Sequence, residues 1–124
     1  PSVSKILGAK DVFAFQDLVR RVPVAENVIQ FAVTLANRTR PQSVLAPQST
    51  KTWIRWGAGP RASQYLILGS KARAILDGRS TPEIADVRAM AGPVLRHRIV
   101  PSFTAEAEGI SAIQIVQRLV EEMP

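Results

Sequence analysis

Prolines and glycines divide the sequence into segments in which apolar side chains recur at helical spacing. An i, i+3, i+4, i+7 spacing places these side chains on one face of an α-helix, so the chain is expected to fold by packing such faces together. The first two stripes are Val12, Phe15, Leu18, Val19 and Val22, then Val28, Ile29, Ala32, Leu35 and Ala36. Pro23 stops the first helix. Pro41 ends the second at Arg40, because the residue before a proline avoids helical backbone angles.

Two more helices are expected between residues 60 and 93. The third begins at Pro60 and stops before Gly78, which suits the left-handed position just past a helix C-terminus. The fourth has Thr81 as its cap and Pro82 in its first position, and Gly92–Pro93 closes it. Their apolar stripes are Ala62, Tyr65, Leu66, Leu68, Ala72, Ile75 and Leu76, then Ile84, Val87, Met90 and Ala91.

A last helix is expected to start at Ser111, because Ser111 and Gln114 have the spacing of a capping box. Its stripe is Ile113, Val116, Leu119, Val120 and Met123. Residues 41–59 and 97–108 lack helical spacing, and Thr52–Trp56 and His97–Val100 within them favour extended structure. The sequence thus predicts a mainly α fold: a small helical bundle with a long structured loop, in which one short two-stranded ribbon could form.

The length of 124 residues suits one domain with a single core. The absence of cysteine excludes disulfides and thiolate zinc sites. No apolar run approaches the roughly 20 residues of a membrane helix, and the N-terminus lacks the apolar stretch of a signal peptide. These observations predict a soluble, cytoplasmic protein without a membrane partner.

The net charge of +6 is concentrated in the middle of the chain. Residues 1–37 carry a net charge of +1, residues 38–98 carry +8 and residues 99–124 carry −3. A basic region favours a polyanion, either a nucleic acid or the phosphates of a nucleotide, although a solvated arginine-rich surface explains the same charge. A basic helical nucleic-acid-binding domain is therefore an alternative function, but no helix shows a base-reading polar face framed by phosphate contacts. An interaction domain anchored by Trp53 and Trp56 is a third alternative, unless both lie in the core.

Catalytic and metal-binding groups are not evident in the sequence. His97 lies between Arg96 and Arg98 and has no neighbouring base or second ligand, so a structural role is favoured and no metal site is predicted. Glu106 and Glu108 would share one face of an extended segment, as surface carboxylates commonly do. No phosphate-binding loop ending in Lys-Ser or Lys-Thr occurs, so the chain is not expected to hydrolyse a triphosphate alone.

The segment Trp56–Ala62 is the one candidate site with a physical mechanism. Gly57 and Gly59 permit a sharp turn and a close approach to a ligand. Pro60 starts a helix and places Arg61 in the first turn, where a cation opposes the helix dipole. Arg61 is explained if an anion completes the site, because the guanidinium and the free amides would both face one phosphate. The alternative is that Arg61 is solvated or paired with an acidic side chain.

Trp56-Gly57-Ala58-Gly59-Pro60-Arg61-Ala62 resembles the Gly-Ala-Ser-Pro-Arg-Ala segment in the lid of MoxR-family AAA+ ATPases. Three further blocks resemble the family in the same order: Leu18–Val24, Gly92–Arg98 and Glu106–Gly109. The resemblance covers the chain from about residue 10 to its end. It implies that Arg61 is the catalytic second-sensor arginine, which reaches the γ-phosphate of ATP. Gly57, Ala58, Gly59, Pro60 and Arg61 would form the cofactor-binding loop, with Gly59 where the family has a helix-capping serine.

The resemblance also implies a domain organisation. Residues 9–124 would be the lid domain, and residues 1–8 a linker or the edge of a cut piece. The phosphate loop, the acidic residues for magnesium and water, and the arginine finger would lie in an absent large α/β domain of the same parent chain, which would hold Mg-ATP. The family further implies ring oligomers, commonly hexamers, with chaperone-like remodelling activity beside von Willebrand factor A domain proteins.

Overall fold

Seven helices and one two-stranded sheet make up the computed structural model, which describes residues 1–124. In chain order the elements are α1 (Ala9–Arg21), α2 (Glu26–Arg38), α3 (Gln48–Trp53), β1 (Ile54–Trp56), α4 (Arg61–Leu76), α5 (Ile84–Leu95), β2 (Val100–Pro101), α6 (Phe103–Ala107) and α7 (Ala112–Glu121). The predicted mainly helical fold with a short ribbon is confirmed. None of the seven helices combines the length and the hydrophobicity that a membrane-spanning helix requires.

The core lies between α2, α4, α5 and α7. Nineteen buried residues form one apolar cluster, and its fully buried large side chains include Leu35, Leu66, Val87, Leu95, Ile115 and Leu119. Leu35, Leu66, Val87 and Leu119 belong to the predicted stripes and Ile115 lies beside one, so the stripes of four helices contribute to the core, whereas Leu95 lies beyond the predicted end of the fourth helix. In the third stripe only Ala62 and Leu66 belong to the buried cluster, and Tyr65 and Leu76 are exposed.

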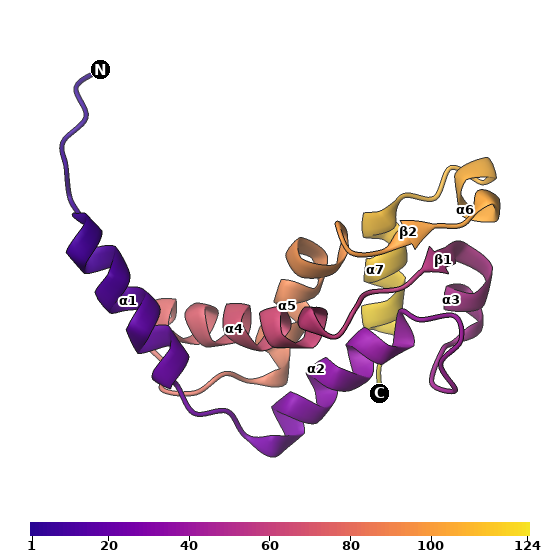
Figure 1. Ribbon diagram of the computed structural model, residues 1–124, viewed down its shortest axis with the longest axis horizontal. Helices are drawn as coiled ribbons and strands as arrows, with labels where there is room; N and C mark the ends of the chain where they lie inside the picture. The colour runs from indigo at the N-terminus through magenta and orange to yellow at the C-terminus, as the bar shows by residue number, and fades with distance from the viewer.

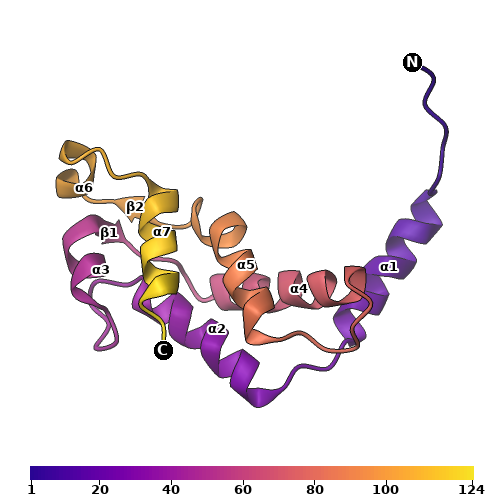
Figure 2. The same cartoon turned by 180° about the vertical axis from the view of Figure 1, so that it is seen from behind.

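The first predicted stripe is different, because α1 contains no buried residue. Val12, Phe15 and Leu18 are 44%, 51% and 42% exposed, so the expectation that this stripe forms core is wrong within this chain, except at Val22, which follows the helix and is buried. Figures 1 and 2 show that α1 projects from one end of the body alongside α4, and that the coil of residues 1–8 extends away from the body. The ribbon, α3 and α6 lie at the opposite end.

The predicted caps and stops agree with the structure at Gly78 and Ser111 and differ at the end of the second helix and at both ends of the fourth. Gly78 has the expected left-handed backbone, with φ +74°. The Ser111 N–H donates to Gln114 Oε1 at 2.8 Å, and Ser111 Oγ accepts from the Gln114 N–H, as a capping box requires. The second helix ends at Arg38, two residues before the predicted end.

The fourth helix starts and stops later than predicted. Its cap is Glu83 and not Thr81, whose hydroxyl instead donates to the Pro23 carbonyl at 2.9 Å. It also continues through Gly92–Pro93 to Leu95, with the Arg96 N–H donating to the Gly92 carbonyl at 3.1 Å. Because glycine relieves the steric restriction before proline, and the residues after Pro93 are buried, the helix persists for half a turn.

Two short helices were not predicted in stretches expected to lack helix. In α3, the buried Thr50 hydroxyl donates to the Arg38 carbonyl at 2.6 Å, so tertiary contact supports a helix without an apolar stripe. In α6, Ser102 Oγ accepts from the Ala105 N–H at 3.2 Å and acts as the cap. Between them β1 and β2 pair antiparallel, with Ile54 opposite Pro101. The second strand is thus shifted toward the C-terminus from the predicted His97–Val100.

A buried carboxylate ties the end of α4 to the start of α5. Asp86 is 1% exposed and accepts hydrogen bonds from Arg79 Nη1 and Nη2 at 2.8 and 2.7 Å and from the Glu83 N–H at 2.7 Å. Arg73 Nε lies 3.2 Å away. The hydrogen bonds from Arg79 are the main reason that the pKa of Asp86 lies below its ordinary value, and they raise the pKa of Arg79. The two arginines compensate the charge that burial would otherwise destabilise.

Candidate functional site

Residues 57–60 connect β1 to α4 and are fixed by a close approach to the end of α2. A Cβ atom added at Gly57 would lie 2.5 Å from the Thr39 carbonyl oxygen, so only glycine fits there without a backbone shift. Neither Gly57 nor Gly59 has a positive φ, and a Cβ at Gly59 would meet open space. Gly57 therefore permits an approach to the chain's own backbone, whereas the sequence analysis expected an approach to a ligand.

Thr39 and Arg40 hold this loop from the other side. The buried Thr39 hydroxyl donates to the Ala36 carbonyl at 2.6 Å and accepts from the Ala58 N–H at 2.9 Å. Arg40 Nε donates to the Ala58 carbonyl at 2.8 Å, and its Nη1 donates to Asn37 Oδ1 at 2.7 Å. Sequence reasoning missed both residues, because they lie seventeen or more positions before the loop. Both backbone groups of Ala58 are thus satisfied within the chain.

Arg61 is the first residue of α4, with Pro60 at the cap position. The predicted start is thus displaced by one residue, and Arg61 still lies in the first turn. No side chain caps this helix, in agreement with glycine at position 59. Gly59, Pro60 and Arg61 are exposed, and the Arg61 side chain takes part in none of the hydrogen bonds or ion pairs of the chain. The alternative of an acidic partner for Arg61 within this chain is therefore not realised.

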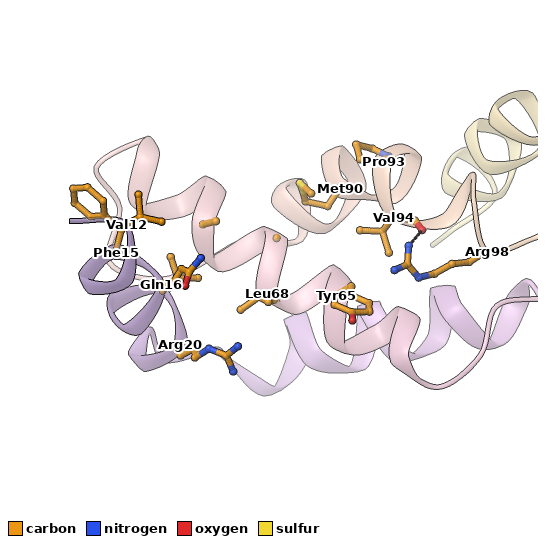
Figure 3. Close-up of a pocket in the computed structure, with 13 residues that line it drawn as sticks. Val12, Phe15, Gln16, Arg20, Tyr65, Leu68, Met90, Pro93, Val94 and Arg98 are labelled. Atoms are coloured by element: carbon orange, nitrogen blue, oxygen red, sulfur yellow. Dashed lines mark hydrogen bonds between the residues drawn. The ribbon is translucent and has the colours of Figure 1, made fainter. Parts of the chain in front are cut away.

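Tyr65 lies one turn after Arg61 on the same side of α4, and an arginine covers its ring. The Arg98 guanidinium carbon lies 4.6 Å from the centroid of the Tyr65 ring. Figure 3 shows the second restraint on Arg98, a hydrogen bond of 2.7 Å from its Nη1 to the Val94 carbonyl. A cation over an aromatic face is attracted by the ring quadrupole. Sequence reasoning placed Tyr65 in the core stripe, and noted Arg98 as a neighbour of His97 and as the end of the family-like block Gly92–Arg98.

A groove of about 700 Å³ runs along α4 between α1 and α5. It is lined by Val12, Phe15, Gln16, Val19, Arg20, Tyr65, Leu68, Gly69, Ala72, Met90, Pro93, Val94 and Arg98, and we call it the α4 groove. Figure 3 shows side chains of α1 at one end and of α5 with Arg98 at the other. Its lining is mostly apolar, and its charged members are both arginines.

The other singled-out residues do not form a catalytic arrangement. His97 is exposed and accepts a hydrogen bond of 3.2 Å from Arg96 Nε. Glu106 and Glu108 lie on α6 and at its C-cap, so they do not alternate along an extended segment as predicted. Glu108 accepts a hydrogen bond of 3.1 Å from Trp53 Nε1. Trp53 packs against the core, whereas Trp56 is 60% exposed.

Several arginines of the basic middle segment make contacts within the chain. Arg40 and Arg79 make the bonds described above, and Arg88 lies with its guanidinium carbon 4.9 Å from the Phe31 ring centroid while it donates to the Val120 carbonyl at 2.8 Å. Arg38 Nη2 donates to the Glu122 carbonyl at 3.2 Å. These arginines therefore stabilise the fold through internal contacts. The net positive charge of residues 38–98 gives correspondingly less support to a nucleic-acid-binding surface.

Comparison with known proteins shows similarity to a domain family and to two named proteins. Residues 46–119 match the model of the AAA lid domain family. The chain is 29% identical over 121 residues to chaperone MoxR1 of Mycobacterium tuberculosis, covering 98% of this chain and 32% of that protein. It is 39% identical over 59 residues to protein MoxR of Paracoccus denitrificans, covering 46% of this chain and 17% of that protein. The chain thus spans about a third or less of the curated relatives it matches.

A solved structure has a similar fold over most of this chain. It is described as a "putative ATPase" from Cytophaga hutchinsonii, and it superposes with a TM-score of 0.84 at 28% identity. The match covers 93% of this chain and 35% of the other. The similarity therefore includes most of the elements described above.

Proposed function

Because the chain belongs to the AAA lid domain family, we propose that it is the lid of a MoxR-type AAA+ ATPase and that Arg61 is its second-sensor arginine. In this proposal residues 9–124 form the lid and residues 1–8 a linker. The parent protein hydrolyses ATP, and the lid couples the nucleotide state to movement in a chaperone-like remodelling complex. One observation carries the proposal: Arg61 is an exposed arginine without an internal partner in the first turn of an uncapped helix.

The electrostatics of this position favour an anionic ligand. The first amides of α4 carry the positive end of the helix dipole, so an isolated arginine there is disfavoured. A phosphate would accept hydrogen bonds from the planar guanidinium and would be attracted by the helix terminus at the same time. Arg61 would then stabilise the charge that develops on the γ-phosphate during hydrolysis.

The remaining residues of the loop would position this arginine. Gly57 and Ala58 are held by Thr39 and Arg40, so the exposed Gly59–Pro60 step and Arg61 start from a fixed base. A fixed starting point matters because phosphoryl transfer depends on accurate placement of charge and little on covalent chemistry. In the proposal Gly57 to Arg61 thus form one loop that faces the nucleotide. Its exposed residues, Gly59 to Arg61, would contact the nucleotide directly.

The rest of the machinery would belong to other parts of the assembly. A large domain of the parent chain would supply the phosphate loop, the magnesium ligands and an arginine finger, and would hold Mg-ATP. The parent would work as a ring, with six subunits as the expected number, in the cytoplasm and beside a von Willebrand factor A domain protein. These statements follow from the resemblance to MoxR-type proteins and are part of the proposal.

The test is the ATPase activity of the full-length parent with Arg61→Ala or Arg61→Lys. We expect Arg61→Ala to lower turnover about 10- to 10³-fold, less than the loss of an arginine finger, because magnesium and the finger also stabilise the transition state. Lysine keeps the charge but loses the planar fork, so Arg61→Lys should recover only part of the activity. Melting of the 124-residue chain should be unchanged, since the Arg61 side chain is exposed and forms no hydrogen bond or ion pair within the chain.

Arg21→Ala is a matched control, because Arg21 is also an exposed arginine near a helix end whose side chain forms no hydrogen bond or ion pair within the chain. Its turnover should equal that of the unmodified parent. Unchanged turnover of Arg61→Ala would refute the sensor role. A lowered melting temperature of the Arg61→Ala chain would instead assign Arg61 a structural role.

A further inference from the structure

Arg98 carries a positive charge that has no acidic partner within the chain. It is exposed and its side chain makes one hydrogen bond, from Nη1 to the Val94 carbonyl at 2.7 Å, and none of the four ion pairs includes it. A carbonyl oxygen offsets only part of a full charge, and a guanidinium has donors on each of its nitrogens. The donors on Nε and Nη2 of Arg98 are therefore free to bind an anionic ligand.

The Tyr65 ring holds this guanidinium beside the first turn of α4. Tyr65 follows Arg61 by one helical turn, so their Cβ atoms lie about 6 Å apart on the same side of the helix. A side chain on a helix leans toward the helix N-terminus, which directs the Tyr65 ring to the turn that carries Arg61. The Arg98 guanidinium carbon lies 4.6 Å from the centroid of that ring, and Figure 3 shows the side chain of Arg98 extending toward Tyr65. Arg61 and Arg98 thus lie on one side of the helix start, although they are far apart in the sequence.

The two segments that carry these arginines contain no acidic residue. Residues 54–65 and 93–101 lie side by side, because β1 pairs with β2 and places Trp56 opposite Val100. Together they contain four arginines, one histidine and no aspartate or glutamate. Cations held close together repel each other, and this repulsion falls when one anion binds to several of them. The arrangement is therefore suited to a ligand with several negative charges, such as a triphosphate, and less to a single carboxylate.

We propose that Arg98 is a second nucleotide-binding arginine, which Tyr65 positions so that Arg98 and Arg61 bind the same triphosphate. Arg61 approaches the triphosphate from α4, and Arg98 approaches it from the segment between α5 and β2. Two guanidinia fix both the place and the direction of a phosphate chain, whereas one fixes its place alone. Tyr65 is a positioning residue, because it acts through Arg98. The inference rests on the proposed function, from which it takes the identity of the anion as ATP.

The ATP affinity and the turnover of the full-length parent provide the first test. Arg98→Ala should lower turnover and weaken the binding of a fluorescent ATP analogue about tenfold, as expected for the loss of a charge-assisted hydrogen bond. Arg96→Ala is the matched control, since Arg96 is exposed, lies two residues away and carries the same charge. This control should bind and turn over ATP as the unmodified parent does. Equal losses in the two variants would show an effect of net charge alone and would overturn the inference.

The same measurements separate this inference from the proposed function. A parent in which Arg61→Ala is impaired and Arg98→Ala is not would overturn the role of Arg98 and leave that of Arg61 in place. A parent in which Arg61→Ala keeps full turnover would refute the sensor role, and with it the shared triphosphate. Impairment of both variants, with an unchanged Arg96→Ala control, would support both roles.

Substitutions of Tyr65 test the positioning role. Tyr65→Phe keeps the aromatic face and should leave ATP affinity unchanged. Tyr65→Leu removes that face and should weaken ATP binding about two- to fivefold, in line with the energy of an exposed cation–π contact. In an Arg98→Ala background the same change should have no further effect, because Tyr65 acts only through Arg98. A loss that adds fully to that of Arg98→Ala would contradict the positioning role.

Chemical protection tests the contact independently of activity. Phenylglyoxal modifies exposed arginines, and mass spectrometry of peptides measures the extent of modification at each position. A non-hydrolysable ATP analogue should slow the modification of Arg61 and Arg98 in the full-length parent, and should leave Arg96 accessible. Protection of Arg61 without protection of Arg98 would overturn the inference. Equal protection of Arg96 would show that the whole segment becomes covered, and would overturn the inference as well.

Discussion

Helices α1 and α7 both carry apolar stripes, but the stripe of α7 is buried in the core and the stripe of α1 is exposed. In α7, Ile115, Val116 and Leu119 are buried between α2, α3 and α5, whereas α1 buries no residue and packs mainly against α4. Periodicity therefore predicts which side chains share a face but not whether another element covers that face. A stripe that the chain itself leaves open is available to something else.

Truncation of one leucine in each helix should give the largest difference in the free energy of unfolding between these two regions. Leu119→Ala removes a side chain that is fully buried in the core and should lower the free energy of unfolding by about 3–4 kcal/mol. Leu18→Ala removes one that is 42% exposed on α1 and should cost less than about 1 kcal/mol. Urea unfolding of the 124-residue chain measures both. Equal losses would mean that α1 is packed as firmly as α7.

The carboxylates that contact Arg79 extend the comparison to charged groups. Asp86 is buried between Arg79 and Arg73, so Asp86→Asn should lower the free energy of unfolding by about 2–3 kcal/mol. Asp77 pairs with the same Arg79 at 2.8 Å, but its side chain is 69% exposed, so Asp77→Asn should cost less than about 1 kcal/mol.

The dependence on pH follows from the lowered pKa of Asp86. The unfolded chain binds a proton at Asp86 near its ordinary value of about 3.9, whereas the folded chain binds it only at lower pH. The contribution of Asp86 is thus complete above that ordinary value and is lost as the pH falls through the folded pKa. The stability difference between the unmodified chain and Asp86→Asn should stay constant from pH 7 to about 5 and shrink below about 4. A difference that grows on acidification would contradict this account.

Substitution of the two glycines of the candidate loop should also change stability unequally, by a smaller difference than in the pairs above. Gly57→Ala forces a backbone shift against Thr39, and we expect a loss of about 1–3 kcal/mol, as for other overpacked sites. Gly59→Ala adds a methyl group in open space without a left-handed backbone, so its stability should stay equal or rise by up to about 1 kcal/mol. The melting temperatures of both variants test whether Gly57 is packed against Thr39 and Gly59 has open space around it.

The helices and part of the candidate site could be predicted from local patterns. Proline and glycine punctuation with apolar spacing located α1, α2, α4, α5 and α7, and the Gly-Ala-Gly-Pro-Arg segment placed Arg61 at a helix start. The short helices α3 and α6 could not be located in this way. They have six and five residues, too few for a stripe, and their stability comes from contacts with distant carbonyls and the core.

The sequence by itself determined which segments form the main helices, where most of them end, which faces are apolar and which family the chain resembles, because these depend on neighbours within a few residues. Only the tertiary structure decided that Thr39 and Arg40 clamp Ala58, that Arg98 covers Tyr65 and that Asp86 lies between two arginines. It also decided that α5 continues past Pro93 and that α1 stays open. Each of these depends on contacts between elements distant in the chain or on how many elements pack on one face. A local pattern carries no information about either, because the free energy of burial depends on what the rest of the chain places there.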